Sequence, residues 1–298
     1  MIKKCMLVLL LMVLFPLIAY CQFYFRWNLW MSTYGLITDD ANLLPYYFAN
    51  NFGLIKGGYD MCIMKVYKAS LKFGELTPED NPFLTYLLYY DATGRVKAYY
   101  RKDECGSNRN SDRNFVGSYY CLLGYDGASG KVTNETFYSE SEEIIRKIDY
   151  TYDSTNRLIV IDCYYPDNKI EWKTKFEYGK GYVDRYEYSS DGSLRYKYRD
   201  VKDAKGKFTK TSNTVRVSDR VFATSSETVT YNLKGFVDKI ESSDYYTKNG
   251  KKDIRNSRFR KYDYKYDSFG NWTDRIMVNH NDDYEWIHCE YSRSEDSK

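Results

Sequence analysis

The side chains in this sequence that could bind a ligand directly are its tryptophans. Trp172, Trp272 and Trp286, together with some of the 34 tyrosines, could form an aromatic platform on which sugar rings or peptide side chains stack. The same rings could instead form the hydrophobic core of the domain. Both interpretations stay open from the sequence, and the three tryptophans are the predicted ligand-binding residues.

Residues suited to metal binding or nucleophilic catalysis are sparse. The chain has two histidines, His280 and His288. On one strand they would share a face, but eight positions cover about 27 Å, too far to share a metal ion. His288 and Cys289 are neighbours, so on a strand they point to opposite faces and cannot act as base and nucleophile. We interpret Asn279–Asp283 as a polar turn, and we predict no metal site and no cofactor.

Carboxylates alone do not predict an enzyme. A glycosidase needs only two, and among 41 acidic residues a pair at catalytic separation arises by chance. The sequence has no Gly-x-Ser-x-Gly, phosphate-binding loop, dinucleotide fingerprint or His-Glu-x-x-His motif. We therefore predict a non-enzymatic protein without catalytic residues; the alternative is an envelope-associated glycoside hydrolase.

The charge balance excludes another class of partner. The formal net charge is +3, and without Lys3 and Lys4 of the N-terminal segment it is 3 − 2 = +1. A value so near zero gives no electrostatic footprint for nucleic acid or an anionic membrane.

A repeated seven-residue pattern organises the rest of the chain. It consists of Tyr, usually Asp or another short polar residue, two variable residues, Gly or Asn, one variable residue and an apolar residue. The strict copies are Tyr90/Asp91/Gly94/Val96, Tyr152/Asp153/Asn156/Leu158, Tyr188/Gly192/Leu194, Tyr231/Gly235/Val237 and Tyr266/Asp267/Gly270/Trp272.

Turn chemistry explains this pattern. An Asp side chain accepts hydrogen bonds from backbone amides two residues on, and Gly or Asn adopts the positive φ that closes a short hairpin loop. Tyr before the turn and an apolar residue after it favour strands that pair across the hairpin. Turn signals recur twice in about 25 residues, which predicts roughly fourteen to sixteen antiparallel strands in sequence order.

The two faces of these strands differ in composition. In Tyr262–Tyr266 and Tyr186–Tyr188 aromatic residues alternate with charged ones, so one face of the sheet is aromatic and the other is charged. The aromatic face is too large to stay open to water, and we expect the sheet to curl onto itself or to pack on an N-terminal cap. An outer-membrane barrel is an alternative, but its outward face would need an apolar band where this chain has charges.

The units Tyr90–Val96, Tyr152–Leu158 and Tyr266–Trp272 resemble the YD repeats of RHS-type proteins, over about Tyr86 to Ile276. That family implies secreted or surface-exposed β-strand proteins, whose large members wind the repeats into a shell around a toxin. This chain has too few repeats for a large shell and has no autocleavage segment or C-terminal toxin domain. The resemblance supports a small stand-alone exported protein of the Bacteroides type, or an accessory of an RHS-type toxin.

Three segments are expected along the chain: a signal peptide over residues 1–21, an irregular N-terminal cap over 22–58 and the β-meander over 59–298. Lys3 and Lys4 precede the apolar run Cys5–Ile18, as in a secretory leader. The alternative is a lipoprotein with Cys21 acylated, which would give the protein a lipid tether. The protein is thus expected in the periplasm, at the cell surface or outside the cell.

Five cysteines follow the leader: Cys62, Cys105, Cys121, Cys163 and Cys289. Their odd number leaves at least one thiol unpaired, and Cys105–Cys121 is the first choice for a disulfide. Together these features predict an exported all-β repeat protein: a long antiparallel meander that serves as a binding or scaffold module for an unidentified glycan or protein of the cell envelope.

Overall fold

The computed structural model of the protein describes residues 55–73, 75–103, 118–204, 208–218, 221–248 and 251–293, all within the unit Ala41–Lys298. The expected signal peptide, nearly all of the expected cap and Cys105 lie outside these residues. Within the described ranges, no helix has the length and apolar character needed to cross a membrane.

Each element in the described part of the chain is a β-strand. The strands are β1 (Met61–Lys72), β2 (Glu75–Pro78), β3 (Leu84–Tyr90), β4 (Val96–Asp103), β5 (Tyr119–Tyr125), β6 (Val132–Tyr138), β7 (Ile144–Tyr152), β8 (Leu158–Tyr164), β9 (Ile170–Gly179), β10 (Tyr182–Ser189), β11 (Leu194–Lys202), β12 (Phe208–Ser218), β13 (Val221–Tyr231), β14 (Val237–Lys248), β15 (Lys251–Tyr266), β16 (Trp272–Asn279) and β17 (Tyr284–Ser292).

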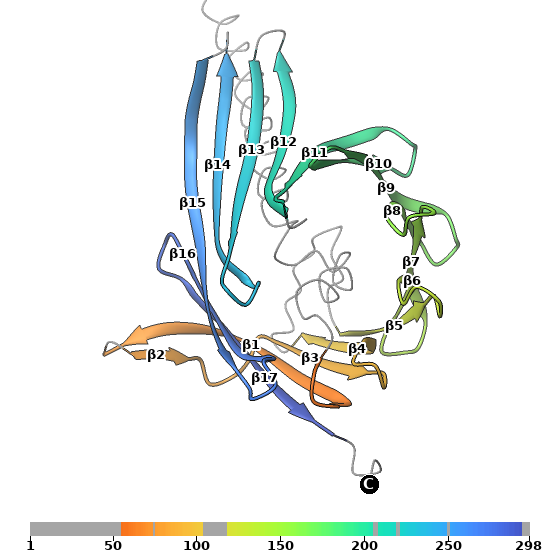
Figure 1. Cartoon of the computed structure of the whole chain (residues 1–298), viewed down its shortest axis with the longest axis vertical. Helices are drawn as coiled ribbons and strands as arrows, with labels where there is room; N and C mark the ends of the chain where they lie inside the picture. Colours follow the sequence, from red (N-terminus) through yellow and green to blue (C-terminus); the bar gives the residue numbers. More distant parts are fainter. Residues whose placement is uncertain are drawn as a thin grey trace, which may run out of the picture. The chain divides into compact units, whose positions relative to one another are not determined.

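The strands form one antiparallel meander that closes on itself (Figure 1). From β3 to β17 each strand pairs with the next in sequence. β1 pairs with β3 over Met61–Val66 and with β17 over Met61–Ala69, which joins the two ends of the meander. The far end of β1 carries β2 as a short hairpin. The predicted all-β antiparallel meander is confirmed, with the correction that the sheet is a closed barrel and not merely curled. Closure removes the exposed edges that β3 and β17 would otherwise present.

The repeated turns have the backbone geometry that their residues favour. Positive φ angles occur at Gly94 (82°), Asn156 (60°), Gly192 (80°), Gly235 (89°) and Gly270 (88°). In each case the motif ends with a one-residue register shift between the paired strands, a β-bulge.

The aspartates of three motifs cap their own turns. Asp91 Oδ1 accepts the backbone N–H of Thr93 at 2.8 Å and that of Arg95 at 3.0 Å. Asp153 and Asp267 make the same pair of contacts in their turns. These Asx turns set the residue at the fifth motif position into its left-handed conformation.

One face of the sheet, here called the inner face, carries a continuous core cluster. On β1, β3–β8, β16 and β17 this face is largely apolar; its least exposed members include Cys62, Leu88, Tyr99, Tyr119, Phe137, Ile148, Ile161 and Trp272. On β11–β14 the buried residues include a polar set: Asp200, Thr211, Asn213, Glu227, Ser242 and Asp244. The predicted aromatic face is therefore continuous over only part of the sheet.

The cysteines in the described residues are free thiols. Cys62, Cys121, Cys163 and Cys289 are all buried and form no disulfide. Because Cys121 is a free thiol, the disulfide expected at this residue is absent, and its expected partner Cys105 lies outside the described ranges.

A tyrosine hydroxyl connects successive repeats. Tyr125 donates to the carbonyl oxygen of Val96, the last residue of the preceding motif. The same contact recurs at intervals along the sheet, in the pairs Tyr152–Val132, Tyr178–Leu158, Tyr231–Phe208, Tyr264–Val237 and Tyr291–Trp272. Each bond satisfies a carbonyl next to a bulge, where the sheet ladder is locally interrupted.

Candidate functional site

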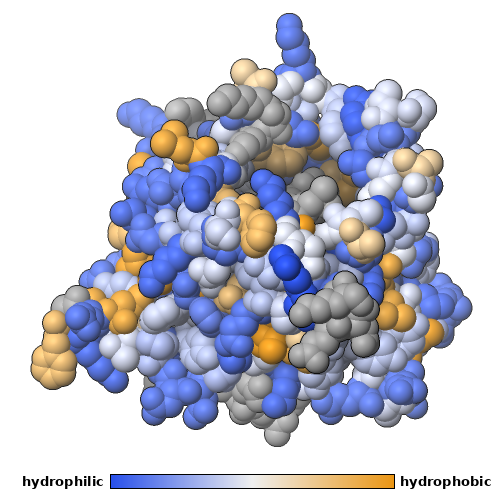
Figure 2. Space-filling view, turned by 60° about the horizontal axis from the view of Figure 1, so that its bottom comes forward, coloured by the Kyte–Doolittle hydropathy of each residue, from blue (hydrophilic) through white to orange (hydrophobic). Residues whose placement is uncertain are grey.

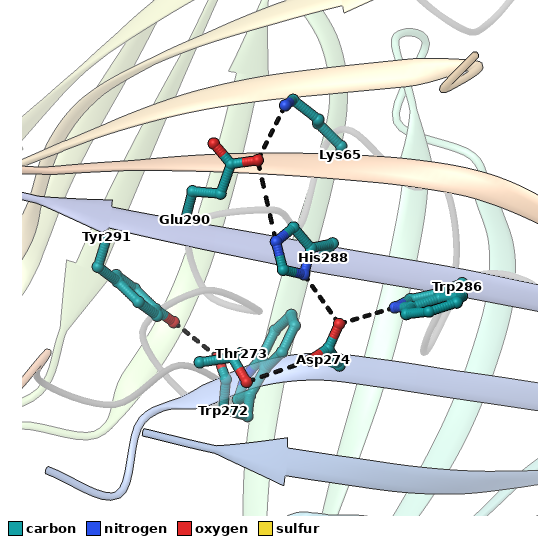
Figure 3. Close-up of polar contacts among 8 residues, drawn as sticks. All are labelled: Lys65, Trp272, Thr273, Asp274, Trp286, His288, Glu290 and Tyr291. Atoms are coloured by element: carbon teal, nitrogen blue, oxygen red, sulfur yellow. Dashed lines mark hydrogen bonds and ion pairs between the residues drawn. The ribbon is translucent and has the colours of Figure 1, made fainter. Parts of the chain in front are cut away.

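A polar network lies on the outer face of the seam where β1 meets β17, beside β16. Ile287 and Cys289 are buried on the inner face, so their neighbours Trp286, His288 and Glu290 face outward. The register places His288 opposite Lys65 of β1 and opposite Asp274 of β16. Figure 3 shows these side chains meeting across the three strands.

Asp274 is the centre of this network. Its Oδ1 lies 2.8 Å from His288 Nδ1 and accepts the Trp286 indole N–H at 2.8 Å, while Thr273 Oγ1 donates to Oδ2 at 3.2 Å (Figure 3). Burial of Asp274 raises its pKa, but the hydrogen bonds from His288 and Trp286 outweigh burial, so the pKa lies below its usual value. Asp274 is therefore a fixed carboxylate and not a proton donor at neutral pH.

Glu290 extends the network on the other side of the imidazole. Its Oε1 lies 2.9 Å from Lys65 Nζ and 3.9 Å from His288 Nε2. The hydrogen bond to Glu290 raises the pKa of Lys65, so the ammonium form is favoured. The network thus runs from the Lys65 ammonium through the Glu290 carboxylate, the His288 imidazole and the Asp274 carboxylate to the Trp286 indole. It contains both donors and acceptors of hydrogen bonds.

Trp286 provides an aromatic surface at the end of this chain. Its indole nitrogen is fixed by Asp274, and the ring is partly exposed with Lys265 Nζ 5.8 Å from the centroid. Tyr67 lies directly opposite on β1. An aromatic ring held in one orientation loses little entropy when a flat apolar ligand surface stacks on it.

The three tryptophans that the sequence predicted as ligand-binding residues lie apart in the structure. Trp272 is only 3% exposed and belongs to the core. Trp172 is paired with Cys163 and packs partly buried against the same core, so it also faces inward. Trp286 alone of the three faces outward, and they therefore form no common platform.

The two histidines lie in different surroundings. Asn279–Asp283 is the turn between β16 and β17, in which Asn279 Oδ1 accepts backbone N–H groups of Asn281 and Asp283. This agrees with the predicted polar turn, and His280 lies exposed within it. His288 and Cys289 face opposite sides of the sheet, as the strand alternation predicts.

Sequence reasoning missed Asp274 and Glu290 as partners of His288, and Lys65 as the partner of Glu290. The usable signal was the alternation of Trp286, His288 and Glu290, which puts an aromatic, a base and an acid on one strand face. Lys65 could not be added from the sequence, because only closure of the sheet brings β1 beside β17.

The hydroxyl of Thr273 is not arranged as an activated nucleophile. It is engaged with Asp274 and not with the imidazole. In the ranges that the structure describes, no three His, Cys, Asp or Glu side chains are placed to hold one metal ion. The arrangement is suited to hydrogen bonding and stacking.

Comparison with known proteins yields distant structural likenesses. No protein-family model and no curated protein matches the chain. A porin-like protein from Bacteroides uniformis superposes with a TM-score of 0.38 at 10% identity, covering 79% of this chain and 98% of that one. One from Bacteroides vulgatus gives 0.34 at 11% identity, covering 76% and 97%. The TcdB2-TccC3 structure gives 0.24 at 13% identity, covering 67% of this chain and 12% of that one. These values assign the chain to no family, so its function is inferred from its own residues.

Proposed function

We propose that this protein is an exported, non-enzymatic binding module that holds a polyhydroxylated ligand, a glycan of the cell envelope, on the outer face of the β1–β17 seam. The observation that carries the proposal is the fixed indole of Trp286 beside the Asp274–His288–Glu290–Lys65 network. Export is proposed from the leader-like segment of the sequence.

The chemistry of the network favours a sugar. A sugar ring has an apolar face that stacks on an indole and hydroxyl groups that both donate and accept hydrogen bonds. Glu290 and Lys65 have side chains that are 48% and 32% exposed, so they can reach a ligand that lies on Trp286. Asp274 is nearly buried and holds the indole and the imidazole in place. The ligand would thus meet a preorganised surface, which lowers the entropic cost of binding.

A glycoside hydrolase fits this geometry less well. Asp274 and Glu290 do flank one imidazole, but hydrolysis needs a carboxylic acid with a raised pKa to protonate the leaving group. Asp274 has a lowered pKa and its oxygens are occupied by three neighbours. Asp274 therefore does not suit the role of general acid.

A binding screen of the purified chain against immobilised polysaccharides tests this proposal, followed by calorimetry on the polysaccharide that binds most tightly. We expect saturable binding that Trp286→Ala weakens by at least about tenfold, because stacking and the polar groups act on one ligand. Trp286→Phe should retain part of the affinity, since it keeps an aromatic face.

His280→Ala is the matched control, because His280 is exposed in the neighbouring turn and outside the network. An effect of Trp286→Ala no larger than that of His280→Ala would contradict this site. If the chain turned over a bound polysaccharide and Glu290→Gln abolished this activity, the protein would be a glycoside hydrolase and not a binding module.

A further inference from the structure

A row of tyrosines on the outer face continues directly from the proposed site. Glu290 lies opposite Ile63, Ile63 opposite Leu87, and Leu87 opposite Tyr100. Tyr100 in turn lies opposite Tyr120, and Tyr120 opposite Tyr138. Six consecutive strands, β17, β1, β3, β4, β5 and β6, thus contribute one residue each to a single line across the sheet.

The sequence neighbours of this row establish that it faces outward. Cys62, Leu88, Tyr99 and Phe137 are each at most 1% exposed on the inner face, and adjacent strand residues point to opposite faces. The residues of the row are partly exposed. At about 4.8 Å between strands, the line from Glu290 to Tyr138 is about 24 Å long.

Tyr120 and Tyr138 of the row stack on each other, so the faces between them are covered and the pair offers its ring edges and outer faces to a ligand. The rings of Tyr120 and Tyr138 are parallel, with centroids 4.7 Å apart and an interplanar angle of 7°. The hydroxyl of Tyr100 donates to Glu140 at 3.1 Å. In the next line, Tyr89 and Leu122 are 38% and 46% exposed. Figure 2, which brings the lower side of Figure 1 forward, shows a mainly hydrophilic surface with separate hydrophobic patches.

Polar side chains border the row on its other side. A second line runs parallel to the row, two residues away along each strand, through His288, Lys65, Thr85 and Lys102. Aromatic rings flanked by ammonium and hydroxyl groups match a ligand that offers apolar ring faces and hydroxyl edges in alternation. An oil-like partner such as a lipid chain would leave these polar groups without hydrogen bonds.

Closure of the sheet disfavours the main competing partner, a peptide strand. Peptides bind sheets by adding a strand to a free edge. Each of the six strands that carry the row is paired on both sides, so none has a free edge here. Recognition on this surface therefore has to use side chains.

We infer that the row Ile63–Leu87–Tyr100–Tyr120–Tyr138 is a track along which an extended oligosaccharide lies, crossing the strands from the Trp286–His288 site toward Tyr138. This inference rests on the proposed function and specifies its ligand as a chain of several sugar units. Each further sugar unit that contacts the row adds contact area without a new loss of overall rotation and translation, so affinity rises with chain length.

The test compares disaccharides and hexasaccharides of the chito-, manno- and xylo- series by calorimetry. The wild-type chain should bind the hexasaccharide of one series at least about tenfold more tightly than its disaccharide. The double variant Tyr120→Ala/Tyr138→Ala should lose this difference while it keeps the disaccharide affinity. Tyr120→Phe should behave as wild type, because stacking does not need the hydroxyl.

Tyr186→Ala is the matched control for tyrosine removal, because Tyr186 lies on the outer face of β10, away from the row. Equal affinity for short and long ligands, with Trp286→Ala still abolishing binding, would overturn the track and leave the proposed function standing. Absence of saturable binding to any saccharide would overturn both. Thermal unfolding of each variant separates loss of binding from loss of fold.

Discussion

Tyr125 Oη, at the end of β5, donates a hydrogen bond to the carbonyl oxygen of Val96, at the start of β4, at 2.5 Å. The same ring lies under the Arg95 guanidinium, 4.7 Å away, and Arg95 is held by Asp91 of the preceding turn. Tyr178, Leu158, Arg157 and Asp153 repeat this arrangement two units later. The repeated sequence motif is thus also a unit of tertiary contact: each turn is fixed by the tyrosine of the next repeat.

Removing one of these hydroxyls should destabilise the fold measurably. Tyr125→Phe leaves the Val96 carbonyl without its partner and should lower the free energy of unfolding by about 1 kcal/mol. Urea denaturation of Tyr125→Phe and of Tyr120→Phe, whose hydroxyl lies on the outer face, is the comparison. Equal losses in the two variants would mean that the inter-repeat bond is not what stabilises this region.

The turn glycines should differ in their tolerance of a methyl group. Gly192 has φ 80° and nothing within 4 Å of an added Cβ, so Gly192→Ala should cost only about 1–2 kcal/mol of left-handed strain. Gly94 has φ 82°, and its Cβ would lie 2.4 Å from the Ile55 carbonyl oxygen. Gly94→Ala should therefore cost more. It should also displace Ile55, which is buried with only 6% of its surface exposed. Chemical denaturation of the two variants checks the order, and the reverse order would contradict the contact.

The pH dependence of stability should carry the signature of a buried carboxyl. Burial raises the pKa of Glu135 to about 8, against the opposing effect of the hydrogen bond from Tyr150. In the unfolded chain the pKa is near its ordinary value of 4.5, so between 4.5 and about 8 the folded state binds more protons than the unfolded state. Stability should therefore fall as pH rises through this window, because the carboxyl ionises in the unfolded chain while it stays protonated in the folded protein.

Glu135→Gln removes the titrating proton and keeps the size of the side chain. It should flatten the decline in unfolding free energy between about pH 5 and pH 8, an effect on the order of a few kcal/mol at the upper end. Denaturation curves across this range provide the measurement. A variant with an unchanged slope would show that the pKa of Glu135 is the same in the folded and the unfolded chain.

Two tryptophans on the same hairpin should separate stability from binding. Trp272 is 3% exposed in the core, so Trp272→Ala should cost about 3–5 kcal/mol. Trp286 lies partly exposed on the outer face, and Trp286→Ala should lose mainly its hydrogen bond to the Asp274 carboxylate, about 1.5–3 kcal/mol. Unfolding and saccharide binding measured on both variants test this. If Trp286→Ala were strongly destabilised, Trp286 would belong to the core and not to the binding site.

Local features of the fold were readable from the sequence because they depend on neighbours in the chain. Asp91, Gly94 and Asn156 form their turns through hydrogen bonds that span four residues at most, so residue type alone identifies them. Alternation along a strand likewise separates His288 from Cys289. An all-β meander with these hairpins follows from such rules.

Closure of the sheet, and with it the site, was decided only by tertiary structure. Whether β1 meets β17 depends on the number, twist and bulges of all the intervening strands, which no local pattern specifies. Closure defines an inside, and that buries Trp272 while leaving Trp286 at the surface. It also brings Lys65 to Glu290 and lines up Tyr100, Tyr120 and Tyr138 behind them. The role of each of these side chains depends on the face of the sheet that it occupies. The sheet has an inside and an outside only because its last strand, β17, pairs with its first, β1.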